Sequence, residues 1–194
     1  MFLIAKVISL IFDPVIVTLV SLILIIRQSE PELNRSVGWF LILFLIGILP
    51  PLIFLAYEKK KGKVTDWFLY NRAERIPIYV ASLVSLSITL LIIWWLEGPR
   101  NLLVFSLTSL LNAVALAFAT YLDHKPSVHV SAMTFFVLVL VLLVDWSFWP
   151  SFFLIPVVAW SRAKLKKHTW PQLSGGFFIT LFIVLITLRL FEFI

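Results

Sequence analysis

Long apolar runs constrain this chain more than any other feature of its sequence. A helix that crosses a bilayer needs about 20 consecutive, mostly apolar residues. Seven candidate runs, the sixth of them short, cover residues 2–26, 37–57, 78–96, 101–121, 128–146, 148–160 and 177–193. Only short polar loops separate them, and no internal repeat divides the chain. The sequence therefore predicts an all-α, polytopic membrane helical bundle with about seven membrane helices, folded as a single integral-membrane domain over residues 1–194.

The composition excludes several functional classes. Hydrophobic residues make up 61% of the chain and charged residues only 13%, whereas soluble domains are about half apolar and about a quarter charged. The chain has no cysteine, which excludes disulfides, thiolate chemistry and Cys-ligated metals. The net charge of +6 is attributed to cytoplasmic loops, anionic lipid or a phosphate-binding site, so membrane lipids and no nucleic acid are the expected partners.

The first run contains two features that interrupt it, Lys6 and the pair Asp13-Pro14. It lacks a small-residue cleavage site before the next loop, so it is interpreted as a retained helix rather than a signal peptide. Pro14 removes one backbone hydrogen bond and predicts a bend. Two placements are open: residues 1–13 lie along the membrane interface, or the helix runs straight through with Asp13 buried.

Basic residues are concentrated on one side of the predicted membrane domain. If every run crosses, the N-terminus and the loops at 58–77, 122–127 and 161–174 share that side. It carries most of the 16 Lys and Arg residues, so the positive-inside rule places it in the cytoplasm of a protein of the cell membrane. All three histidines fall there as well: His124, His129 and His168.

The loop at 65–77 is the first of three polar loops on this side. It contains Arg72 and Arg75, which are three residues apart and share a face if the segment is helical. Arginine binds phosphate through paired hydrogen bonds. A basic amphipathic segment lying on anionic lipid is the alternative interpretation.

The second loop, 123–129, is predicted to begin a helix. Pro126 suits the first helical position, and the N–H groups and positive dipole end of that helix then form an anion site. The Ser127 hydroxyl and the Lys125 ammonium lie beside it, and His129 follows within the first turn. The alternative is an ordinary helix start with an interfacial histidine.

The third loop, 161–172, joins two predicted helices. Its lysines fit a positive-inside loop, whereas Arg162 and His168 are the candidates for chemistry.

Together the three loops resemble the motifs of the type 2 phosphatidic acid phosphatases, which share a helical core with the vanadium haloperoxidases. The family's third motif, Ser-Arg-x5-His-x3-Asp, appears as Ser161-Arg162-x5-His168-x3-Gln172. Its second motif, Pro-Ser-Gly-His, appears as residues 126–129 with Val128 in place of the glycine. The resemblance covers about residues 58–176.

The first motif, Lys-x6-Arg-Pro, is degenerate. It appears as Arg75-Ile76-Pro77, with Phe68 where the lysine would stand. Arg72 and Lys125 are the two candidates to supply the missing charge.

The resemblance implies a metal-independent, cofactor-free phosphohydrolase that forms a phosphohistidine intermediate at the membrane interface. His168 would be the nucleophile and His129 the general acid. Five residues would bind the phosphate of a lipid phosphate or diphosphate: Arg72, Arg75, Lys125, Ser127 and Arg162.

Two departures from the family's motifs leave an alternative function open. Val128 replaces the glycine of the second motif, so the backbone would approach the phosphate less closely. Gln172 replaces the aspartate that orients the nucleophilic histidine, and an amide accepts the ring N–H but supplies no negative charge. Another carboxylate, Asp66 or Asp123, could take that role. The alternative function is a non-catalytic lipid-phosphate-binding or transport protein of the same fold.

Overall fold

The computed structural model describes every residue except 68 and 70. Within the described residues the chain is helical throughout and contains no strand, which confirms the predicted all-α class. The chain divides into two compact units. The first comprises Met1–Gln28 with Lys125–Ile194, and the second comprises Ser29–His124. Each unit is described by itself, and the single-domain interpretation stays a prediction.

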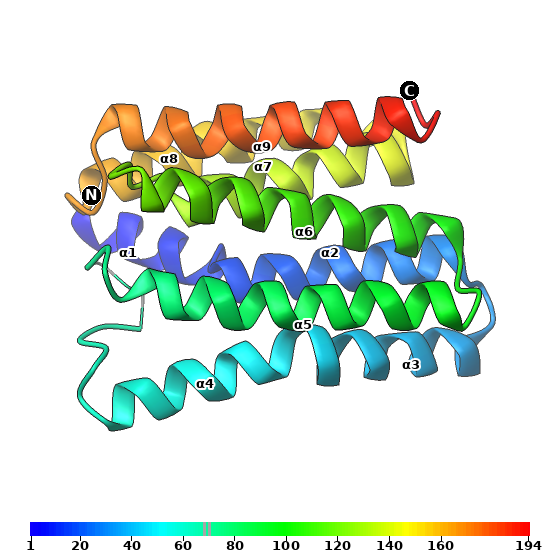
Figure 1. Cartoon of the computed structure of the whole chain (residues 1–194). Helices are drawn as coiled ribbons and strands as arrows, with labels where there is room; N and C mark the ends of the chain where they lie inside the picture. Colours follow the sequence, from blue (N-terminus) through cyan, green and yellow to red (C-terminus); the bar gives the residue numbers. More distant parts are fainter. Residues whose placement is uncertain (68, 70) are drawn as a thin grey trace. The chain divides into compact units, whose positions relative to one another are not determined.

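The first unit is built around one buried helix. Its α-helices are α1 (Phe2–Ile11), α2 (Pro14–Ser29), α7 (Val128–Val139), α8 (Leu154–Lys164) and α9 (Trp170–Leu190) (Figure 1). A π-helical turn, η2 (Leu140–Val144), and a 3₁₀ helix, η3 (Trp146–Phe153), join α7 to α8. Helix α7 packs against both α8 and α9, and α1 packs against α8. Val130, Met133 and Val137 of α7 meet Val158 of α8 and Leu173 of α9 in the core.

The predicted bend at Pro14 is confirmed. Helices α1 and α2 meet at an angle of 41°. The Asp13 carboxylate accepts a hydrogen bond of 2.9 Å from the backbone N–H of Val15, so it caps the first turn of α2. Asp13 is half-buried at this break, and its side chain has a local structural role.

The second unit contains three long helical segments. A continuous segment runs through α3 (Leu33–Ile42), the π-helical η1 (Leu43–Ile48) and α4 (Leu49–Lys60), and it is followed by α5 (Arg75–Trp95) and α6 (Arg100–Tyr121). Helix α5 packs against α6 on one side and against α4 and η1 on the other (Figure 1). Pro50 and Pro51 have no N–H to donate to the turn before them, which accounts for the wider π-helical turn at η1.

Four helices in the described part of the chain are long and apolar enough to cross a membrane, and the bent α1–α2 pair is a fifth if it counts as one span. They are the segments Leu33–Lys60, Arg75–Trp95, Arg100–Tyr121 and Trp170–Leu190. The apolar helix Val128–Val144 is shorter. These helices fit an integral membrane protein, whereas crossing by all seven predicted runs stays a prediction.

A helix break at Asp145 lies near the end of the fifth predicted run, just before the sixth. Asp145 has an extended backbone and caps η3 by accepting a hydrogen bond of 2.7 Å from the Ser147 N–H. None of the η3 side chains is buried, and Trp146 and Trp149 are among the exposed ones. Exposed aromatic rings of this kind suit the membrane interface.

Candidate functional site

Six of the eight predicted site residues lie in the first unit, and all but Arg162 are close in sequence to the starts of α7 and α9. Helix α7 begins at Val128 with Ser127 as its N-cap, and α9 begins at Trp170 with Thr169 as its N-cap. The prediction that Pro126 takes the first helical position is wrong, because Pro126 precedes the N-cap. The extended backbone of Ser127 is the conformation that an N-cap residue requires.

Gln172 joins these two helix starts through its backbone. Its carbonyl oxygen accepts a hydrogen bond of 2.9 Å from the N–H of Ser127. A second link lies one turn further along α7 and about two turns further along α9, where the Ser131 and Thr180 hydroxyls are 2.7 Å apart. These contacts fix the turn that carries Ser127 and His129 against the first turn of α9.

The side chain of Gln172 fixes the tautomer of the neutral His168 ring. Its Oε1 accepts from the backbone N–H of Thr169 at 3.2 Å and lies 3.1 Å from Nδ1 of His168. A backbone N–H can only donate, so the contact with Thr169 fixes the amide with its oxygen facing both groups. Nδ1 of His168 must therefore carry the proton in that hydrogen bond. The lone pair of the neutral ring is then on Nε2, where a nucleophile needs it.

Ser127 contributes a buried hydroxyl beside this histidine-bearing segment. The residue is fully buried, its hydroxyl does not cap α7, and Oγ has no hydrogen-bond partner among the described residues. Leaving a buried polar group unsatisfied costs about 1–3 kcal/mol. An anion oxygen at the N-terminus of α7 would satisfy this hydroxyl and would also meet the positive end of the helix dipole.

The two histidines are both buried in this unit. His129 is 5% exposed in the first turn of α7, and His168 is 8% exposed between α8 and α9. Lys125, which precedes the turn, is half-buried. Buried histidines near a helix N-terminus, a hydroxyl and a lysine form a set suited to proton transfer and anion binding.

Arg162 adds a buried cation to the same unit. It lies in the last turn of α8, is 2% exposed, and donates from Nη1 to the Ser9 hydroxyl at 2.6 Å. A cation in the last helical turn is favoured by the negative end of the helix dipole. The guanidinium has five N–H donors, which suits it to several phosphate oxygens at once.

The other two predicted residues, Arg72 and Arg75, belong to the second unit. Helix α5 begins at Arg75, and Arg72 lies in the turn before it, so the two do not share a helical face. Arg72 forms an ion pair with Asp123. Arg75 is buried and donates from Nε to the Leu69 carbonyl at 2.9 Å. Phe68, at the position of the missing lysine, lies outside the described residues.

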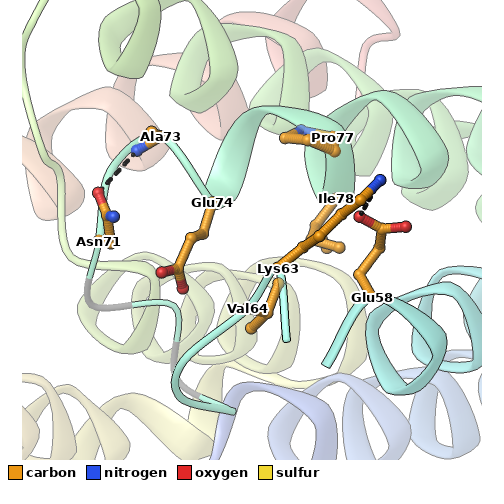
Figure 2. A pocket seen from close by; sticks show the side chains of 8 residues that line it. All are labelled: Glu58, Lys63, Val64, Asn71, Ala73, Glu74, Pro77 and Ile78. Atoms are coloured by element: carbon orange, nitrogen blue, oxygen red, sulfur yellow. Dashed lines mark hydrogen bonds and ion pairs between the residues drawn. The ribbon is translucent and has the colours of Figure 1, made fainter. Parts of the chain in front are cut away.

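A pocket of about 340 Å³ lies in the second unit, where the loop after α4 meets the start of α5 (Figure 2). Two buried carboxylates line it. Glu58 pairs with Lys63 at 3.6 Å, and Glu74 accepts from the N–H and hydroxyl of Thr65 at 3.1 and 3.0 Å. Neither Arg72 nor Arg75 is among its lining residues. Carboxylates repel phosphate, so this pocket is not the candidate anion site.

The described residues contain no group of three or more His, Cys, Asp or Glu side chains placed to hold a metal ion. The same unit also buries two hydrogen-bond donors, the Ser127 hydroxyl and the Arg162 guanidinium. These groups bind anions rather than cations.

Three residues that support this arrangement were missed in the sequence: Ser9, Thr169 and Gly176. Thr169 could have been found, because Thr-x-x-Gln before an apolar run is a capping box. Ser9 gives no local signal, since its contact with Arg162 joins residues far apart in sequence. Gly176 is needed for the close packing of α9 against the turn at Ser127, and only the structure reveals this contact.

Gly176 lets α9 approach the turn that carries Ser127. A Cβ at this position would lie 2.5 Å from the Ser127 carbonyl oxygen, so Gly176→Ala must push the turn away. We expect it to lower the free energy of unfolding by about 1–3 kcal/mol. Its neighbour is a matched control, because a Cβ at Gly175 comes only within 3.9 Å of Pro126. Gly175→Ala should leave stability unchanged or raise it by up to about 1 kcal/mol. Unfolding in detergent measures both, and equal effects would contradict this packing.

Comparison of the chain with models of protein families, with curated proteins and with solved structures finds no match.

Proposed function

We propose that this chain is a membrane-embedded phosphatase that hydrolyses a lipid phosphate or diphosphate through a phosphohistidine intermediate. The observation that carries the proposal is the double role of Gln172. Its side chain holds the Nδ1–H of His168, and its backbone holds the N–H of Ser127. The proposed nucleophile and the proposed anion site are thereby attached to one residue.

In the first step, Nε2 of His168 attacks phosphorus while the bond from phosphorus to the lipid oxygen breaks. His129, in its protonated form, donates a proton to the leaving oxygen, so the lipid product departs as a neutral alcohol, or as a monophosphate when the substrate is a diphosphate. The Ser127 hydroxyl, the α7 N-terminus and the Arg162 guanidinium stabilise the charge on the transferring group. Lys125 adds a further positive charge.

In the second step, water attacks the phosphohistidine. His129 now accepts a proton from this water, the bond from nitrogen to phosphorus breaks, and inorganic phosphate is released. Both histidines return to their starting states, and no other reactant is needed. Neutral Gln172 keeps the ring of His168 oriented throughout, but it does not stabilise the positive charge of the phosphorylated ring.

The membrane setting supports a lipid substrate. An apolar span, Trp170–Leu190, starts directly beside the proposed site, so the chains of an amphiphile can stay in lipid while its head group enters. We place the site on the cytoplasmic side of the cell membrane, because most of the basic residues lie on that side when every run crosses. Polyprenyl phosphates, phosphatidic acid and phosphatidylglycerol phosphate all have the required chemistry.

The direct test is phosphate release from a panel of these lipid phosphates by the purified chain in chelator. We expect hydrolysis of at least one of them to persist when divalent cations are removed. Binding of a lipid phosphate without any release would favour the non-catalytic alternative, for which the uncharged Gln172 is the supporting observation. If the chain neither binds nor hydrolyses any of these lipids, both the phosphatase function and the non-catalytic alternative are contradicted.

We also propose that all seven apolar runs cross the membrane, which places the termini on opposite sides. Because the chain has no native cysteine, a single cysteine introduced at either end reports its own accessibility. Impermeant thiol labelling of sealed vesicles should modify only one of the two variants. Equal labelling of both would show that an odd number of runs, most simply the short helix Val128–Val144 or the segment after it, does not cross.

A further inference from the structure

The phosphate-binding segment of α8 is attached to the N-terminal helix by two side-chain hydrogen bonds. Arg162 donates from Nη1 to the Ser9 hydroxyl at 2.6 Å, and the Ser161 hydroxyl donates to the Ala5 carbonyl at 2.7 Å. Ala5 and Ser9 are one helical turn apart on α1 and therefore share a face. Two adjacent residues of the third motif are thus held by one face of α1.

This contact is the main buried feature of α1. Ala5 and Ser9 are its only buried residues, whereas Leu3, Val7 and Leu10 are exposed apolar side chains. Small residues let two helices approach closely within a membrane. The buried face of α1 therefore fits the end of α8, and the rest of its surface suits lipid.

The Ser9 hydroxyl has a different hydrogen-bond partner from that of most serines inside helices. A serine inside a helix commonly donates to the carbonyl four residues earlier, as Ser21 does to Val17 at 2.8 Å. For Ser9 that carbonyl belongs to Ala5, which accepts from Ser161. The Ser9 oxygen instead accepts from a buried guanidinium, so its removal affects a charged group rather than its own helix.

We propose that Ser9 is a positioning residue that orients Arg162 for phosphate, an inference that rests on the proposed function. Arginine has a long side chain that adopts many rotamers, and its planar fork binds phosphate well only in one orientation. The hydrogen bond from Nη1 fixes one edge of the guanidinium against α1. An arginine held in this way has its fork in one fixed direction when phosphate binds, and α1 becomes part of the site.

Four variants of the full-length chain in nanodiscs test this inference: Ser9→Ala, Ser9→Thr, Arg162→Lys and the double variant Ser9→Ala with Arg162→Lys. Because a hydrogen bond to a charged group is lost, Ser9→Ala should lower kcat/KM about tenfold and should weaken inhibition by orthovanadate to a similar extent. Ser9→Thr keeps the hydroxyl and should restore most of the activity. The double variant should be no slower than Arg162→Lys alone.

Ser21→Ala is the matched control, since it removes a buried hydroxyl of the same unit that bonds only within its own helix. It should change kcat/KM and vanadate inhibition less than twofold. Equal small effects of Ser9→Ala and Ser21→Ala would overturn the positioning role of Ser9 but leave the proposed function intact. So would additive losses in the double variant, or loss of thermal stability without rescue by Ser9→Thr. A wild-type chain that neither hydrolyses lipid phosphates nor binds vanadate would overturn the proposed function, and this inference with it.

Discussion

Replacing His168 by alanine should abolish hydrolysis, with a loss in kcat of at least about 10⁴-fold, because removal of a covalent nucleophile leaves only binding and charge stabilisation. Gln172 orients the buried ring of His168 with Nδ1 protonated, which leaves Nε2 available for the attack that we propose. The rate of phosphate release from the best lipid substrate measures the effect. Binding of that lipid should change much less than the rate.

His124→Ala is the matched control for this variant. His124 is exposed, and its Nδ1 lies 2.8 Å from the Leu122 carbonyl, so it has no place in the proposed chemistry. Its loss should leave kcat within about twofold of wild type, as expected for a surface substitution. A His168→Ala variant that retains more than a tenth of the wild-type rate would contradict the assignment of the nucleophile.

Replacing Gln172 by leucine should lower kcat by about 10²- to 10⁴-fold. Leucine cannot accept the N–H of Thr169 or the Nδ1–H of His168, so the ring loses its fixed tautomer, and the wrong tautomer costs a serine protease about 10⁴-fold. Because the Gln172 carbonyl still accepts from Ser127, the fold should be retained. Kinetics and thermal unfolding of the same sample separate the two effects.

Gln172→Glu tests the missing charge without changing the shape of the side chain. Glutamate at this position of a capping box accepts the same backbone N–H, and its charge stabilises the cationic phosphohistidine. We therefore expect kcat to rise. A nearby anion favours the protonated ring and raises the pKa of His168. Since the ring must be neutral to attack, the acidic limb of the kcat/KM profile should move to higher pH. An unchanged profile would show that Gln172 does not contact the nucleophile.

The helical fold was predictable because its signals are local. Each apolar run of about 20 residues must satisfy its own backbone hydrogen bonds in lipid, and a helix does so. The bend at Pro14 follows from one missing N–H in the same way. The limits of the prediction lie where the sequence gives no local signal, as at the π-helical turn η2 and at the helix break that follows it at Asp145.

The candidate site could be predicted only as separate residues. Ser127, His129, Arg162 and His168 could be selected by residue type and spacing. The sequence could not show that one glutamine joins Ser127 to His168, because a backbone carbonyl carries no side-chain signature. Nor could it show that Ser9 contacts Arg162, since the two residues lie more than 150 positions apart.

Trapping of a phosphoenzyme tests the central claim most directly. The chain in nanodiscs is mixed with its lipid substrate labelled on the phosphorus and quenched in alkali, which preserves phosphohistidine. We predict that wild type carries the label on His168, as located by peptide mass spectrometry, and that His168→Ala carries none while His124→Ala labels normally. Rapid hydrolysis with no label on any histidine, or equal labelling of wild type and His168→Ala, would contradict the account.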